Sequence, residues 1–118
     1  MIAWVVALAW AECGEVALAT LTRDMDEALG AFASLDEAAF VGAAARAEAE
    51  LPCLVEVIDH EAAAEWHVLQ AVRAWYADPE HPELARLHLS AAATSGLSAS
   101  DFADVLVAGS PLGDLRAK

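Results

Sequence analysis

The amino-acid sequence predicts an all-α fold: a compact bundle of five or six short helices around a central helix at residues 60–78. Apolar residues recur at helical spacing along most of the chain, and capping residues, glycines and prolines mark the expected helix ends. In addition, 58% of the 118 residues are hydrophobic, and many are Ala, the strongest helix former. The length predicts one domain, residues 1–118, with 110–118 as a mobile tail.

The central helix has the clearest boundaries. Asp59 is placed to cap its N-terminus, and Pro79 ends it because the residue before a proline avoids helical geometry. Leu69 and Tyr76 widen the predicted core stripe, and Trp66 lies almost opposite its centre. The stripe consists of Ala64, Val68, Ala71, Val72 and Trp75.

Residues 1–22 predict a buried amphipathic helix. Its charge-free start is far shorter than the roughly 20 residues of a spanning helix, and it lacks the basic start of a signal peptide. We therefore expect a cytoplasmic protein, and its preference for Arg over Lys suggests a GC-rich bacterial gene. Trp4 and Leu8 form a second apolar patch that indicates a partner. The main apolar face consists of Val6, Trp10, Cys13, Ala17 and Leu21.

Four further helices are predicted from capping patterns. Asp24 caps a short second helix, and the capping box 34–37 begins a third, with Phe40, Val41, Ala44, Ala47 and Leu51 inward. A helix over 82–94 turns Leu84, Leu87 and Ala91 inward and ends at Gly96. A last helix follows the cap at 98–101 and ends at Gly109, with Phe102, Val105 and Leu106 inward.

Two features leave alternatives open. The β-branched residues of 53–58 favour a strand, but the chain offers no convincing second strand, so we expect a helical turn. A strand that pairs with its own copy across a dimer is the alternative. Cys13 and Cys53 lack a CxxC pattern, and we expect buried free thiols; a disulfide between them stays open.

Charge and motifs exclude several functions. The net charge of −13 opposes binding to a nucleic-acid backbone, which depends on Lys and Arg, unless the protein imitates DNA. An acidic surface suits a basic partner or simply solubility. The chain has no Gly-rich phosphate loop and no GxSxG, so no nucleotide cofactor is expected. The high apolar content predicts a homodimer or a contact with another protein.

The candidate catalytic residues lie on the central helix. Glu61 and Glu65 are one turn apart, and partial burial would give one of them the raised pKa of an acid or base. We expect this pair to lie on a solvated helix edge; if the protein is an enzyme, the catalytic candidate is Glu65, assisted by His67 or Tyr76. The four His are spaced seven apart in two pairs and show no HExxH or helical ExxH pattern, so no metal site is expected.

Function is expected to be peptide or protein binding, by an accessory protein of the adaptor or immunity type. An aromatic-lined groove would supply the contact area, with acidic steering of a basic partner. The expected contact residues are Trp66, Tyr76, Trp75, Trp4 and Glu61. The first alternative is a peptide-tailoring enzyme, as in lanthipeptide-like pathways, that promotes ring closure by preorganising its substrate. A weaker alternative is a DNA mimic.

Overall fold

The computed structural model describes residues 13–97, 101–107 and 110–117. Within these ranges the regular structure is helical, apart from one isolated β-bridge, which confirms the all-α prediction. The structure holds one chain, so the homodimer stays a prediction. The elements are α2 (Leu18–Ala33), α3 (Glu37–Glu50), a 3-10 turn η1 (Leu51–Cys53), α4 (His60–Ala77), α5 (Glu83–Thr94) and α6 (Pro111–Ala117).

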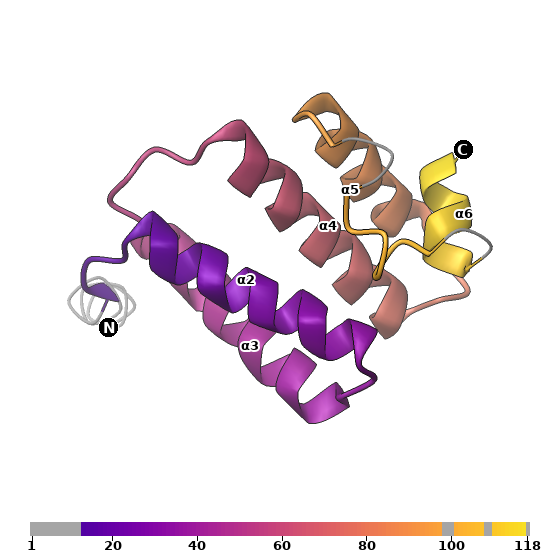
Figure 1. The fold of residues 1–118 in the computed structure, drawn as a ribbon, viewed down its shortest axis with the longest axis horizontal. Coiled ribbons are helices and arrows are strands. Elements are labelled where there is room, and N and C mark those ends of the chain that lie inside the picture. The colour runs from indigo at the N-terminus through magenta and orange to yellow at the C-terminus, as the bar shows by residue number, and fades with distance from the viewer. Residues whose placement is uncertain (1–12, 98–100, 108–109, 118) are drawn as a thin grey trace, which may run out of the picture.

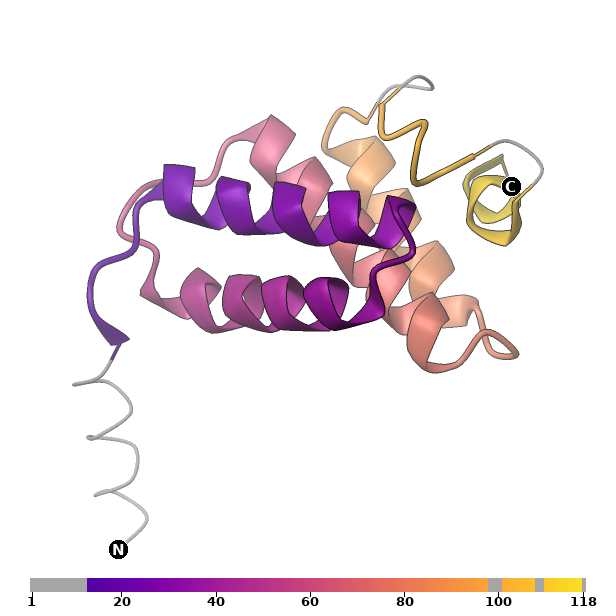
Figure 2. The ribbon, with the colours of Figure 1, turned by 60° about the horizontal axis from the view of Figure 1, so that its bottom comes forward.

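Two helical hairpins form the bundle, α2–α3 and α4–α5 (Figure 1). The helix α4 lies between α2 and α5, so the predicted central helix does occupy the middle of the fold. A view from another side shows α2 and α3 as one layer, with α4 and α5 behind it and α6 beside α5 (Figure 2). The largest fully buried apolar side chains are Leu21, Met25, Leu69, Leu106, Val68 and Val72.

The predicted boundaries of α4 are confirmed. The side chain of Asp59 accepts a hydrogen bond from the backbone N–H of Ala62 at 2.7 Å, which satisfies one of the free donors at the helix start. The helix ends at Ala77, before Asp78 and Pro79. Its predicted stripe is buried at Ala64, Val68, Ala71 and Val72 and half-buried at Trp75.

The predicted continuous helix at the N-terminus is wrong where the structure describes it. The chain leaves helical geometry at Gly14, whose φ of +66° is a conformation that glycine adopts without strain, and α2 begins only at Leu18. The rest of the predicted helix, with Trp4 and Trp10, lies outside the described residues. The predicted cap at Asp24 is also wrong, because α2 runs through this residue and buries it.

Asp24 belongs to a charged network between α2 and α3. Its Oδ1 lies 3.5 Å from Nε of Arg46 and 3.6 Å from Nη2 of Arg23. The carboxyl group of Glu50 lies close enough to that of Asp24 for the two groups to compete for one proton. Burial and the neighbouring Asp24 raise the pKa of Glu50 to about 7, so Glu50 holds this proton in acid and gives it up near neutral pH.

A disulfide and three hydrogen bonds join residues 13–18, at the start of α2, to residues 53–56, which precede α4. Cys13 and Cys53 form a disulfide, so the expectation of free thiols is wrong. Val16 donates to the carbonyl of Cys53 and accepts from the N–H of Val55, both at 3.1 Å. A carboxylate oxygen of Glu56 accepts from the N–H of Leu18 at 3.0 Å and thereby caps α2.

The disulfide and these hydrogen bonds hold residues 53–56 against the start of α2. The expected helical turn is present only as η1, which ends at Cys53; residues 54–59 form no regular helix or strand, apart from one parallel bridge between Leu54 and Val16. None of the helices in the described ranges is long and apolar enough to cross a membrane.

On α3 the predicted core residues Phe40, Ala44 and Ala47 are buried, but Val41 is 52% exposed. The helix also begins two residues later than its capping box predicts. Asp36, not Ser34, is the N-cap, and its carboxylate accepts from the N–H of Ala39 at 3.2 Å.

The buried face of α5 differs from the prediction. Ala85, Leu89 and Ala92 are buried, whereas Leu84 and Leu87 are 54% and 65% exposed. Both sets recur at helical spacing, so periodicity alone could not choose between them. The small side chains of the observed face let α4 and α5 approach closely. Gly96 follows the helix with φ +104°, as predicted.

The C-terminal segment also differs. Residues 101–106 form turns in place of the predicted last helix, although Val105 and Leu106 are buried as expected; its cap and its end at Gly109 fall outside the described residues. Part of the expected mobile tail forms α6, which buries Leu112 and Leu115. These two leucines lie one turn apart and give the helix an apolar face that packs beside α5.

Candidate functional site

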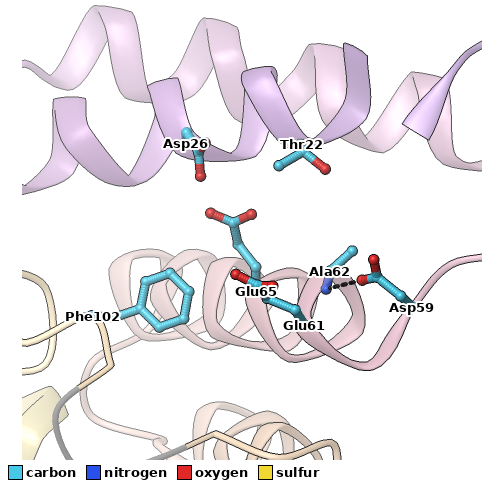
Figure 3. Close-up of a pocket in the computed structure, with 7 residues that line it drawn as sticks. All are labelled: Thr22, Asp26, Asp59, Glu61, Ala62, Glu65 and Phe102. Atoms are coloured by element: carbon cyan, nitrogen blue, oxygen red, sulfur yellow. Dashed lines mark hydrogen bonds between the residues drawn. The ribbon is translucent and has the colours of Figure 1, made fainter. Parts of the chain in front are cut away.

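A cavity of about 280 Å³ lies between α2 and α4 (Figure 3). Four of the residues around it are acidic and none is basic. We call it the acidic cavity; its lining residues are Thr22, Asp26, Asp59, Glu61, Ala62, Glu65 and Phe102. The predicted carboxylate pair Glu61 and Glu65 is therefore brought to one cavity, because the two residues lie one turn apart on the face of α4 that meets α2.

Glu65 has the most altered environment in this cavity. It is only 6% exposed, and its carboxyl group points from α4 toward Asp26 on α2 (Figure 3). Burial, a hydrogen bond and the charge of Asp26, and the charge of Glu61 together raise the pKa of Glu65 to about 9. Glu65 is therefore protonated at neutral pH and donates to the Asp26 carboxylate, so the pair holds a proton that could be given to a bound molecule.

A second cavity, of about 190 Å³, lies at the turn between α2 and α3. Three aromatic side chains and one leucine form its apolar part, and two carboxylates complete the lining. We call it the aromatic pocket; its lining residues are Phe32, Leu35, Asp36, Glu37, Phe40 and Tyr76.

Ring contacts hold the aromatic pocket in shape. The ring centroid of Phe40 lies 5.5 Å from that of Phe32 and 5.7 Å from that of Tyr76, both with tilted or edge-on geometry. Trp75 contacts Phe32 edge-on at 6.4 Å. Such pairs favour fixed relative orientations, so the pocket is preformed.

Polar and exposed groups surround this pocket. Leu35 is 91% exposed and has a φ of +61°, an uncommon conformation for a residue other than glycine. Tyr76 is 42% exposed, and a hydrogen bond to Glu37 raises the pKa of its hydroxyl. Apolar surface and negative charge therefore stand next to each other at one accessible turn.

The other predicted site residues are dispersed. His67 is half-buried on the side of α4 that faces α5, with its Nδ1 at 3.1 Å from Nδ1 of His88, and is not among the residues that line the acidic cavity. Trp66 is half-buried and packs against the core. Trp75 contacts Phe32, which lines the aromatic pocket, but is not itself among the lining residues. Trp4 lies outside the described residues.

Sequence reasoning missed several residues of both cavities. Asp26, Phe32 and Phe40 carry no local pattern that predicts a cavity, and Phe40 is predicted only as a core residue. Only the pairing of α2 with α3 and α4 brings them to a cavity, and no local spacing signals that pairing. Within the described ranges, no group of three or more His, Cys, Asp or Glu is arranged to hold a metal ion.

Comparison of the chain with protein-family models, with curated proteins and with solved structures finds no match. The geometry and charge of the acidic cavity and the aromatic pocket are therefore the features that indicate a function.

Proposed function

We propose that this protein is a small peptide-binding accessory module of the adaptor or immunity type. Its aromatic pocket receives an apolar side chain of a partner segment, and Asp36 and Glu37 attract a Lys or Arg beside that side chain. The proposal places the partner in the class of basic peptides or proteins with an exposed apolar residue.

The aromatic pocket is the observation that carries this proposal. Preformed aromatic pockets are favourable sites for a peptide anchor, because little ordering of the binding surface is needed. The adjacent carboxylates and the net charge of −13 favour approach by a basic segment, which mainly raises the association rate. The exposed side chains of Leu35 and Tyr76 extend the apolar surface outward from the pocket.

Selection from a random peptide library tests the proposal directly. We expect enrichment of peptides with one large apolar residue next to Lys or Arg. The best peptide should lose affinity by about tenfold or more with Tyr76→Ala, since truncation of a central aromatic contact costs about 1–2 kcal/mol or more. Glu37→Gln should weaken the binding chiefly at low salt, where charge attraction is least screened.

Leu87→Ala is the matched control, because Leu87 is an exposed apolar residue on α5, outside the aromatic pocket. This variant should bind the selected peptide as the unmodified protein does. Enrichment of acidic or wholly polar peptides would contradict the proposal, as would equal affinity of the unmodified protein and Tyr76→Ala.

Glu65 favours a second candidate function, the peptide-tailoring enzyme. A protonated carboxyl group in a cavity of about 280 Å³ is a general acid at neutral pH, provided that a substrate atom comes within hydrogen-bonding distance. Ring closure in a modified peptide can use such an acid, and the cavity walls would hold the chain in a reactive shape.

Mass spectrometry of peptides incubated with the protein tests this candidate. Turnover should fall by about 100-fold or more with Glu65→Gln, the usual range for removal of a general acid, and should persist with Glu83→Gln, an exposed carboxylate on α5. Full turnover by Glu65→Gln would reject acid catalysis at this residue. Peptide binding without any change in peptide mass would contradict the tailoring enzyme and agree with the binding module.

A further inference from the structure

His67 on α4 and His88 on α5 meet across the interface between two neighbouring helices. Their Nδ1 atoms are 3.1 Å apart, and their ring centroids are 5.4 Å apart with an angle of 32° between the ring planes. The nitrogens therefore face each other, with the rings behind them. In the absence of another ligand, one Nδ1–H donates to the lone pair of the other Nδ1.

This arrangement also suits a metal ion. Neutral imidazole nitrogen is a common ligand of Zn²⁺, Cu²⁺ and Ni²⁺, and an ion bound to both nitrogens would lie to one side of the line between them and replace their hydrogen bond. With Zn–N bonds of about 2.0–2.1 Å, two nitrogens on a tetrahedral ion are roughly 3.3–3.4 Å apart. The observed separation of 3.1 Å is within a few tenths of an ångström of that value.

We propose that His67 and His88 form a two-histidine site for a divalent transition-metal ion, of which Zn²⁺ is the reference case. No third ligand of the described chain completes the site, so water would occupy the remaining positions. Both side chains are half-buried, so each residue keeps some contact with solvent.

Two further properties support the site. The net charge of −13 raises the concentration of cations around the whole molecule. In addition, the two ligands belong to different helices and are 21 residues apart, so a bound ion would cross-link α4 to α5. An ion that binds only the folded state stabilises it by mass action.

Titration of the untagged protein with ZnCl₂ at pH 7.5 is the direct test. The titration is carried out without reductant, so that Cys13 and Cys53 stay bonded and supply no thiolate. We expect one equivalent of Zn²⁺ to saturate the site and to raise the melting temperature. Each of the variants His67→Ala and His88→Ala should weaken the binding by about tenfold or more and abolish the thermal shift.

The other two histidines provide matched controls. His60 and His81 are exposed, and His60→Ala and His81→Ala should bind Zn²⁺ as the unmodified protein does. Equal loss in all four variants would overturn the proposal, because it would indicate diffuse binding to an acidic surface. Saturation that is unchanged in His67→Ala would overturn it as well.

Proton NMR of the unmodified protein keeps the test independent of variant folding. Addition of Zn²⁺ should shift or broaden the ring resonances of two histidines and leave those of His60 and His81 in place. If no histidine resonance responds to millimolar Zn²⁺, the pair is an interhelical hydrogen bond only, and the proposed site does not exist.

Discussion

The carboxyl group of Glu65 on α4 points toward that of Asp26 on α2 across the acidic cavity (Figure 3), and a proton shared between the two groups links the two halves of the bundle. The pair exists because the packing of α2 on α4 buries Glu65 and places a second carboxyl group opposite it. Its energetic consequence depends on pH, because the folded state keeps this proton at pH values where the unfolded chain has lost it.

Stability should fall as pH rises from about 5 to 9. The pKa of Glu65 is about 9 in the folded protein and 4.5 by its ordinary value, so its contribution is complete below pH 4.5 and is lost as pH rises through 9. One such group changes the unfolding free energy by at most about 1.4 kcal/mol per pH unit. Urea unfolding at several pH values measures this slope, which should be smaller in Glu65→Gln. An identical slope in that variant would show that Glu65 titrates normally.

The Asp24–Arg46 ion pair should contribute more to the free energy of unfolding than the exposed Glu27–Arg46 pair. Arg46 contacts both Asp24, whose side chain is 2% exposed, and Glu27, whose side chain is 54% exposed. Asp24→Ala removes the buried carboxylate that pairs with Arg46 and should cost about 1.5–3 kcal/mol, the range for a hydrogen bond to a charged group. Glu27→Ala should cost less than about 1 kcal/mol. Equal losses in denaturant unfolding would contradict the assigned burial.

The Cys13–Cys53 disulfide should stabilise the fold by about 2–4 kcal/mol, because it closes a long loop in the unfolded chain. Its two cysteines are 40 residues apart, and the bond also holds the segment from which Glu56 caps α2. Unfolding with and without reductant, and of the double variant Cys13→Ser/Cys53→Ser, measures this effect. Two free thiols in the folded, unreduced protein would refute the pairing.

Leu89→Ala should lower the free energy of unfolding far more than Leu87→Ala, because the two leucines lie on opposite faces of α5. Leu89 is 3% exposed and Leu87 is 65% exposed. Truncation of the buried leucine should cost about 2–5 kcal/mol, whereas truncation of the exposed one should change stability by less than about 0.5 kcal/mol in the monomer. A large loss for Leu87→Ala that depends on protein concentration would instead place this face in a homodimer interface.

The sequence by itself determined the all-α class, the bounds of α4 and the burial of most of its stripe. These features depend on local physical chemistry: the 3.6-residue period, the cap at Asp59 and the exclusion of helix before Pro79. The sequence also placed Glu61 and Glu65 on one face of α4, because residues four apart on a helix are neighbours.

The buried face of α5 and the course of α2 through Asp24 depend on contacts between helices. Two sets of α5 residues have helical spacing, and only contact with α4 selected Ala85, Leu89 and Ala92. Asp24 resembles a cap in the sequence, yet α2 continues through it, and its Oδ1 pairs with Arg46 of α3 in place of a helix end.

The two meeting points of greatest interest, Glu65 with Asp26 and His67 with His88, join residues on different helices. Periodicity shows which residues share a face of one helix. It does not show which face of a second helix will pack against them. That choice is made by the packing of all the helices together, and it determines both the acidic cavity and the histidine pair.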